Sequence, residues 1–489
     1  MGPIDRRSFL ATATAAFSRL AWGANPRLAE GVVSSKSPSG PPPRRPNVIV
    51  MICDDLGYGD LGCYGSKLRT PNLDRMAGEG MRFTKYDSAH PICSASRGAL
   101  LTGRYSTRTG TKPVYFPYDS DGMNKDETTI ADLLHGKGYR TKCVGKWHLG
   151  NTPEYLPTSR GFDSYLGLPY SVDMQPLPMI RNTSIVEQNT DRSLLTPKYT
   201  EESVQFIQSA ASTPFFLYLA FSYPHIPIYA SPEFRGRSRQ GIYGDAVEEI
   251  DWSVGEIMRA VESAGAEEET LILFTGDHGP WYQGSPGELR GRKGTTYEGG
   301  LRVPFIARWK EVISPGQVCD HSVFSLDVLP TIARLCDAGM PKKSLDGMDI
   351  SALLSGGEMP ERAKPILNFS GLHGGFDLQC TRLGRWKLRI AQYSRETYVL
   401  GSSPGDNRLL ARPELYDLDE DPEESYDVAA LHPEIVDKLQ RAIEEMIGTF
   451  PGQVKEAYNA LKQNRAYPTT PPGAASRPAN YVAPPWHFD

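Results

Sequence analysis

Five continuous apolar runs mark the first two-thirds of the chain, at residues 48–52, 141–144, 215–221, 271–274 and 303–307. Runs of this length suit strands that are buried on both faces, as in a parallel sheet. Between them, apolar residues recur with helical spacing at 70–80, 127–134 and 248–264. This alternation of strands and helices predicts an α/β fold, with a mainly parallel sheet sandwiched by helices.

The pattern changes near residue 365. Short mixed segments at 386–390, 397–400 and 414–418 alternate with turns, and a helical pattern follows at about 433–449. This part predicts a small C-terminal antiparallel sheet with one helix. We therefore expect an α/β domain over residues 46–364, an α+β subdomain over 365–465 and a Pro-rich tail over 466–489.

The N-terminus has the pattern of a targeting segment. Asp5-Arg6-Arg7-Ser8-Phe9-Leu10 resembles a twin-arginine export signal, and a weakly apolar stretch follows over residues 8–18. That stretch is shorter than the roughly 20 apolar residues that a membrane span needs. We predict an export signal over 1–29, a Ser/Pro linker over 30–45, and a bacterial protein delivered to the periplasm or secreted by the twin-arginine machinery, with no stable membrane span.

Composition narrows the class of partner. The chain is 39% hydrophobic and 23% charged, with a net charge of -5, which is ordinary for a soluble globular protein. The acidic balance argues against a general nucleic-acid binder but permits a basic site for a small anion. Seven cysteines show no paired metal-type spacing, and whether the six besides Cys93 form disulfides stays open.

Side chains that can do chemistry follow directly after four of the predicted strands: Asp54, Asp55, Lys146, His148, His225, Asp277 and His278. Ligands bind at the carboxyl ends of strands in open α/β sheets, so these residues should meet at one edge. Asp54, Asp55 and Asp277 would offer hard oxygen ligands that suit Ca²⁺ or Mg²⁺. Taken alone, the pair Asp54-Asp55 would fit a polar turn equally well. The presence of Asp277 and His278 after a second strand favours the metal site.

The segment over residues 57–62, Gly-Tyr-Gly-Asp-Leu-Gly, matches a dinucleotide-binding pattern. Such a site needs its glycines to open a helix directly, whereas the next helix start is Thr70-Pro71. We interpret these glycines as turn residues.

Cys93 stands at the start of a predicted helix over 94–101, with Ala95 two residues on and Arg97 four residues on. A lone cysteine is usually a buried structural thiol. Here the extended segment, Pro-Ile-Cys-Ser-Ala-Ser-Arg-Gly-Ala-Leu-Leu-Thr-Gly-Arg, resembles the signature of the type I (formylglycine-dependent) sulfatases of the alkaline phosphatase superfamily. Further segments at 145–150, 224–227 and 291–300 resemble other signatures of that family, and the resemblance covers about residues 46–430.

The resemblance implies an arylsulfatase-like enzyme that hydrolyses sulfate esters of an aryl alcohol or a carbohydrate. A formylglycine-generating maturation enzyme would oxidise Cys93 to formylglycine, whose hydrate is the nucleophile. The family pattern implies that the cation is held by Asp54, Asp55, Asp277, His278 and the modified Cys93.

The remaining roles are also implied by the resemblance. Arg97 and Lys146 would steady the hydrated aldehyde and the sulfate. His225 and Lys293 would face the leaving oxygen, which one of them protonates. His148 would take a proton from the second hydroxyl of the gem-diol.

Two positions depart from the common family pattern. Ala95 stands where many relatives have Pro, which we interpret as neutral. His278 stands where many have Asn, and imidazole is a less natural ligand for a hard cation, so the identity of the metal stays open. Two alternatives also stay open: a phosphonate or phosphate ester hydrolase of the same superfamily, and a non-catalytic binder of sulfated glycans in which Cys93 remains a thiol. The substrate would be selected by loops at 151–200, 231–245 and 279–292.

Overall fold

The computed structural model describes residues 45–210, 213–371, 375–394 and 406–465, which belong to one compact unit. The expected export signal, most of the expected linker, the segment 397–400 and the Pro-rich tail lie outside the described residues. The expected domain boundaries therefore stay predictions.

The largest element within the described residues is a ten-stranded sheet. Its strands are β1 (Asn47–Cys53), β2 (Met81–Phe83), β4 (Arg140–Gly145), β5 (Ser164–Gly167), β6 (Met179–Arg181), β7 (Ser184–Glu187), β8 (Phe215–Ala220), β9 (Thr270–Gly276), β10 (Phe305–Arg308) and β11 (Gln317–Cys319). They lie in the order β11-β2-β10-β9-β1-β8-β4-β5-β6-β7. The five central strands, β9 to β5, are parallel, so the predicted parallel sheet is confirmed there.

One of the predicted apolar runs forms a different kind of pair. The run at 303–307 becomes β10, which runs antiparallel to β9, with Ile306 opposite Phe274. A parallel neighbour needs a crossover connection over a face of the sheet. Between these two strands the only described helix is the four-residue α7 (Glu298–Leu301), which is too short to cross a face of the sheet. The chain instead turns back, and β10 pairs with β9 in the antiparallel direction.

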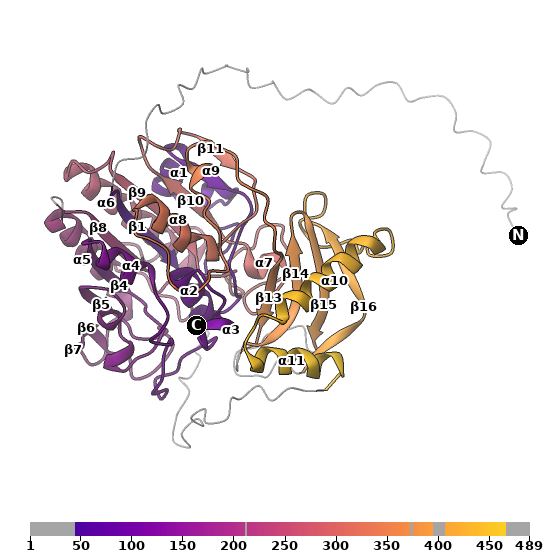
Figure 1. The fold of residues 1–489 in the computed structure, drawn as a ribbon. Coiled ribbons are helices and arrows are strands. Elements are labelled where there is room, and N and C mark those ends of the chain that lie inside the picture. Colours follow the sequence, from indigo (N-terminus) through magenta and orange to yellow (C-terminus); the bar gives the residue numbers. More distant parts are fainter. Residues whose placement is uncertain (1–44, 211–212, 372–374, 395–405, 466–489) are drawn as a thin grey trace, which may run out of the picture. The chain divides into compact units, whose positions relative to one another are not determined.

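Both faces of the sheet are covered, which explains why the strands are continuously apolar. Val48, Val50 and Ile52 pack into one core, and Ile49 and Met51 pack into the other. The first core is closed by α2 (Cys93–Thr102), α4 (Ile130–Gly136) and α8 (Val328–Leu335), and the second by α1 (Pro71–Gly78), α5 (Leu195–Ala210) and α6 (Gly241–Ser263) (Figure 1). Each fully buried aliphatic side chain stabilises the fold by roughly 1.5–3 kcal/mol.

The predicted helices are present, but two begin elsewhere. Helix α4 begins at Ile130 rather than 127, because Thr129 and Asp132 form a reciprocal capping box. Glu127 instead forms ion pairs with Arg104 and Lys343. Helix α6 begins seven residues before the predicted 248, since its buried apolar stripe extends upstream to Tyr243.

The C-terminal part holds a four-stranded antiparallel sheet in the order β13 (Ile366–Ser370), β14 (Asp377–Leu383), β15 (Trp386–Tyr393) and β16 (Asn407–Asp417). The prediction of a single helix is wrong: two helices are described there, α10 (Pro433–Ile447) and α11 (Gly452–Lys462). Pro451 lies between the two helices. After it, Val454, Tyr458 and Leu461 repeat at helical spacing and bury a second apolar helix face in the same core.

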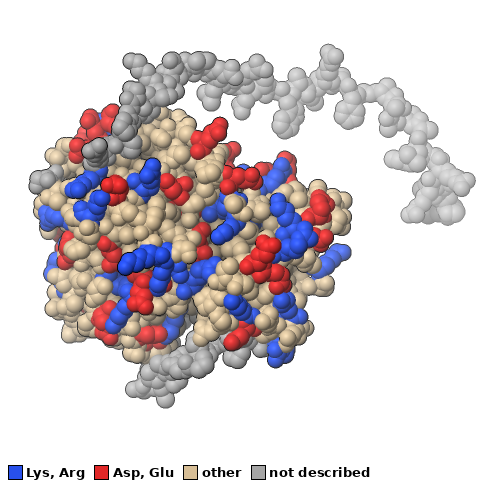
Figure 2. Space-filling view, in the orientation of Figure 1, with Lys and Arg blue, Asp and Glu red and all other residues tan. Residues whose placement is uncertain are grey.

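Shorter elements complete the described chain: β3 (Tyr86–Asp87), β12 (Val323–Phe324), α3 (Ser106–Thr109) and α9 (Ser351–Leu354). Strands β3 and β12 form a separate parallel pair. No helix within the described ranges is both long and apolar enough to cross a membrane. Basic and acidic side chains are interspersed over the face seen in Figure 2.

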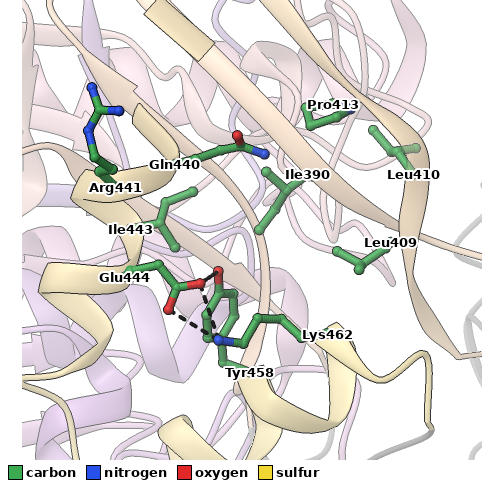
Figure 3. Close-up of a pocket in the computed structure, with 10 residues that line it drawn as sticks. All are labelled: Ile390, Leu409, Leu410, Pro413, Gln440, Arg441, Ile443, Glu444, Tyr458 and Lys462. Atoms are coloured by element: carbon green, nitrogen blue, oxygen red, sulfur yellow. Dashed lines mark hydrogen bonds and ion pairs between the residues drawn. The ribbon is translucent and has the colours of Figure 1, made fainter. Parts of the chain in front are cut away.

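A cavity of about 420 Å³ opens beside α10 and α11. Its wall includes Ile390, Leu409 and Ile443, and Glu444 accepts hydrogen bonds there from Tyr458 and Lys462 (Figure 3). None of the residues lining it is a site residue predicted from the sequence.

Candidate active site

The polar residues that follow the central strands meet at one edge of the sheet. Strands β9, β1, β8 and β4 are adjacent and parallel, so their carboxyl ends lie together. Backbone hydrogen bonds join these ends: Asp277 N donates to Cys53 O at 2.9 Å, and Lys146 N donates to Ala220 O at 2.8 Å. The structure brings together all of the predicted site residues that follow strands.

A cluster of four buried side chains stands at the centre of this edge. Asp54, Asp55, Cys93 and His278 each offer one ligand atom, and these atoms all lie within 4.8 Å of one another. Cys93, the first residue of α2, has its Sγ 3.2 Å from His278 Nε2 and 3.5 Å from Asp54 Oδ1. The residue is a thiol here; in a hydrated aldehyde both oxygens would be bonded to Cβ, one of them close to the present position of Sγ. Burial, with a further effect from Asp54, raises the pKa of this thiol.

Asp277 lies beside the cluster but is bound mainly by other groups. Its Oδ2 accepts from Arg97 Nε at 3.1 Å, and its Oδ1 accepts from the backbone N–H groups of Asp55 and His278 at 3.2 and 3.0 Å. Burial and the charge of Asp54 raise the pKa of Asp277 to about 7 although Arg97 opposes them. Burial therefore favours the protonated form of Asp277 despite its ion pair with Arg97.

Three buried cations, Arg97, Lys146 and Lys293, pair with the three carboxylates of the site. Lys146 Nζ forms an ion pair with Asp54 and donates to Ser171 Oγ at 3.1 Å. Lys293 Nζ donates to Asp55 Oδ1 at 2.7 Å. Burial alone would raise the pKa of Asp54, but Lys146, then His225 and Arg97, hold it well below its usual range.

Hydrogen bonds to backbone carbonyls determine which nitrogen of two histidines carries the proton. His278 Nδ1 lies 2.9 Å from Gly279 O, and a carbonyl only accepts, so Nδ1 is the donor and the lone pair of Nε2 faces the cluster, where Cys93 Sγ lies 3.2 Å away. Burial and Lys293 lower the pKa of His278 to about 3, which keeps the ring neutral. His225 Nδ1 similarly donates to Ile226 O, and its Nε2 lies 3.8 Å from Asp55 Oδ2.

His148 has the opposite tautomer. Its Nε2 donates to Tyr115 O at 3.1 Å, which leaves Nδ1 as an unprotonated atom with no partner among the described residues. Burial and Lys146 lower the pKa of His148 well below its usual range. His148 and Asp55 both have left-handed backbone, with φ of 60° and 66°. Such strain costs on the order of 1–3 kcal/mol at each position and is typical of functional sites.

The donor atoms fit a divalent cation. Asp55 Oδ2 is buried and accepts no hydrogen bond from the described part of the chain, a state that costs free energy unless another charge faces it. The neutral Nε2 of His278 points toward Asp55 Oδ1 at 3.7 Å and Asp277 Oδ1 at 3.6 Å. A cation bound among these atoms would satisfy the orphaned oxygen and take the oxygen ligands that Ca²⁺ and Mg²⁺ prefer.

Several contacts in the site could not be read from the sequence. Ser171 and the carbonyls of Tyr115 and Gly279 orient Lys146, His148 and His278, and the sequence around Tyr115 and Ser171 carries no motif that marks them. The glycines of 57–62 do not open a long helix, and Gly57 packs against the backbone of Ser285, as expected of turn residues.

Comparison with known proteins agrees with this geometry. The family model described as Sulfatase matches residues 46–338. The chain belongs to the sulfatase family. It is 36% identical to human arylsulfatase A over 493 aligned residues, which cover 89% of this chain and 95% of the relative. It is 35% identical to mouse N-acetylgalactosamine-6-sulfatase, with 84% and 88% of the two chains covered.

A solved structure from work on the metabolism of multiple glycosaminoglycans by Bacteroides thetaiotaomicron has a TM-score of 0.75 and 27% identity, and the match covers 82% of this chain and 99% of the other. This chain is thus a type I sulfatase of the alkaline phosphatase superfamily, an enzyme that hydrolyses sulfate esters. The family implies a formylglycine and a divalent metal, and a buried cluster of Asp54, Asp55, Cys93 and His278 is present.

Proposed function

We propose that this sulfatase acts through a formylglycine made from Cys93 and through a Ca²⁺ ion. The observation that carries the proposal is the position of Cys93. Cys93 is the first residue of the buried helix α2, and its Sγ lies in contact with Asp54 and His278. The N–H groups at a helix start favour anions, which suits the arrival of a sulfate group.

Asp54, Asp55, Asp277 and His278, together with the oxidised residue 93, would hold the cation. Oxygen ligands predominate in this set and favour Ca²⁺, with Mg²⁺ as the alternative. When present, the hydrated formylglycine would supply a hydroxyl nucleophile together with a second hydroxyl on the same carbon, which serine lacks. The cation would withdraw charge from the sulfate oxygens.

The remaining residues divide into anion-binding and proton-moving groups. Arg97 and Lys146 would neutralise the sulfate. His148 Nδ1, which has a free lone pair and a neutral ring, would accept a proton from residue 93. His225 and Lys293, both beside Asp55, would face the leaving oxygen, and one of them would protonate it.

The electrostatic contribution of such an arrangement is large. A cation about 4 Å from the ester contributes up to about 4 kcal/mol at an effective dielectric constant near 20. Every ~1.4 kcal/mol of transition-state stabilisation raises the rate tenfold. Preorganised charges can therefore supply much of the rate enhancement before any proton moves.

We further propose a sulfated carbohydrate as substrate. The relative named N-acetylgalactosamine-6-sulfatase and the structure from work on glycosaminoglycan metabolism support this class. Selection among substrates would come from the segments at 151–200, 231–245 and 279–292; the first is not only a loop, since it contains β5, β6, β7 and the start of α5, and the second contains the start of α6. We also propose that residues 1–29 direct export to the periplasm by the twin-arginine route, ahead of the linker at 30–45, the catalytic domain at 46–364 and the subdomain at 365–465.

Mass spectrometry of the tryptic peptide 86–97 tests the nucleophile, with protein from a host that has the maturation enzyme. We expect a mass lower by the thiol-to-aldehyde difference, and we expect Cys93→Ala to abolish hydrolysis of 4-nitrophenyl sulfate with an unchanged circular dichroism spectrum. An unmodified thiol in an active enzyme would contradict the proposal.

The same preparation separates the alternatives. Faster turnover of an aryl phosphodiester than of an aryl sulfate would favour the phosphonate or phosphate ester hydrolase. Binding of a sulfated glycan without turnover of any ester would favour the non-catalytic binder.

A further inference from the structure

The loop that carries Lys293 is held by residues of the small C-terminal sheet. Lys293 itself contacts Asp55, but the residues after it are fixed from β13, β14 and β15. Ser370 Oγ donates to Gly294 O at 2.9 Å, and Thr296 Oγ1 donates to Gln379 Oε1 at 2.9 Å. These contacts tie the loop to elements that lie outside the large sheet.

Arg389 on β15 adds further contacts to the loop that carries Lys293. The Arg389 guanidinium donates to Thr296 Oγ1 at 3.1 Å and lies over the Tyr297 ring at 3.7 Å from its centroid. Arg290 also lies over that ring, at 4.1 Å from the centroid. The planar guanidinium groups favour such stacking, so Tyr297 is fixed in orientation.

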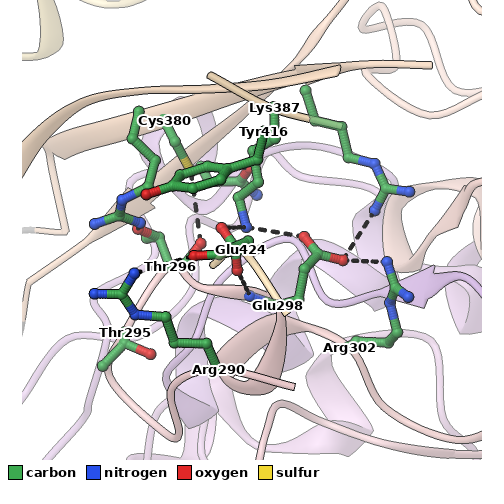
Figure 4. A network of polar contacts seen from close by, with 12 residues as sticks. Arg290, Thr295, Thr296, Glu298, Arg302, Cys380, Lys387, Tyr416 and Glu424 are labelled. Carbon is green, nitrogen blue, oxygen red and sulfur yellow. Dashed lines mark hydrogen bonds and ion pairs between the residues drawn. The ribbon is translucent and has the colours of Figure 1, made fainter. Parts of the chain in front are cut away.

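The loop ends at a buried ionic cluster. Lys387 Nζ is fully buried and lies 2.8 Å from Glu298 Oε1 and 3.0 Å from Glu424 Oε1. Glu424 Oε2 also accepts from the backbone N–H of Glu298 at 2.6 Å, so one carboxylate binds both the lysine and the end of the loop (Figure 4). Arg302 pairs with Glu298, and Arg382 lies 3.3 Å from it.

Charge balance in this cluster depends on Lys387. Burial would raise the pKa of Glu298, but Lys387, Arg302 and Arg382 hold it below its usual range. Burial raises the pKa of Glu424, with a further effect from Glu298 that Lys387 opposes. Without Lys387, Glu424 would lose its buried ion pair while Arg302 and Arg382 still paired with Glu298, and an uncompensated buried carboxylate is costly.

We propose that Lys387 is a positioning residue for Lys293: it holds Glu298 and Glu424 together, and thereby fixes the loop that aims Lys293 at the leaving oxygen. The inference rests on the proposed role of Lys293. It assigns the small sheet a part in catalysis, although none of its residues belongs to the proposed catalytic group.

A double-mutant cycle tests this, with 4-nitrophenyl sulfate and phenyl sulfate as probes of good and poorer leaving groups. We expect Lys387→Met, like Lys293→Ala, to lower kcat for phenyl sulfate by about 10- to 100-fold and to lower it less for 4-nitrophenyl sulfate. The double variant should be no slower than Lys293→Ala alone, because both changes remove the same interaction.

The control is Lys462→Met, which removes a partly exposed lysine that pairs with Glu444 and should leave both rates unchanged. If Lys387→Met does not fold, the same kcat measurements are made on Glu424→Gln, which keeps the shape of the side chain. Equal slowing of the two esters by Lys387→Met, multiplicative losses in the double variant, or failure of both variants to fold would overturn the inference. Absence of leaving-group dependence in Lys293→Ala would instead contradict the proposed role of Lys293.

Discussion

At the scale of single residues, His278 combines two features that bear on the metal. Its Nδ1 is bound to the Gly279 carbonyl, so only Nε2 can reach a cation. Imidazole nitrogen is a softer donor than an amide oxygen, and Ca²⁺ prefers oxygen. His278 should therefore weaken Ca²⁺ binding relative to an asparagine at the same position.

We predict that His278→Asn tightens Ca²⁺ binding by about tenfold, or ~1.4 kcal/mol. Isothermal titration of metal-depleted protein with CaCl₂ measures this directly. The matched control is His321→Asn, which changes a half-exposed histidine beside Asp320 and should leave the Kd unchanged. Weaker Ca²⁺ binding by His278→Asn would show that the imidazole is the better ligand at this site.

At the scale of elements, the turns after the central strands are shaped by close backbone contacts. Gly145 ends β4 immediately before Lys146 and has φ of 103°. A Cβ built at Gly145 would lie 1.9 Å from the carbonyl oxygen of Ala220 on β8. Only glycine permits both this backbone conformation and this approach.

We predict that Gly145→Ala destabilises the fold by about 2–6 kcal/mol, the sum of backbone strain and overpacking. Urea denaturation followed by circular dichroism would measure the change in the free energy of unfolding. Gly136→Ala is the control, because nothing lies within 4 Å of a Cβ built there. Equal stability of the two variants would show that the β4–β8 contact is more adaptable than the structure indicates.

At the scale of the whole molecule, metal binding should contribute to stability. A ligand that binds only the folded state at 100 times its Kd stabilises by about 2.7 kcal/mol. The buried Asp55 oxygen that accepts no hydrogen bond from the described residues would be satisfied by a bound cation. The folded state without metal should therefore unfold at lower temperature.

We predict that removal of divalent ions with EDTA lowers Tm by a few degrees, and that Ca²⁺ restores it more effectively than Mg²⁺. Differential scanning calorimetry at constant ionic strength separates this effect from general salt screening. A Tm that neither EDTA nor Ca²⁺ changes would contradict the cation site.

The parallel sheet and most of the candidate site residues could be predicted from the sequence because the relevant signals are local. Continuous apolar runs report burial on both faces, so the parallel strands and the polar residues after them could be identified by position alone. The segment around Cys93 likewise identified the family before any contact was known. Helix boundaries were less accurate, since the start of α4 depends on the Thr129–Asp132 capping box and the start of α6 on distant packing.

The tertiary structure alone decided how these residues are oriented. Lys293 lies 238 positions from Asp55, and Lys387 lies 89 positions from Glu298, so no local pattern could report either contact. The tautomers of His148 and His278 depend on backbone carbonyls, which every residue has and no motif distinguishes. Composition and periodicity determine which groups reach the edge of the sheet, whereas long-range packing determines which atoms face one another there.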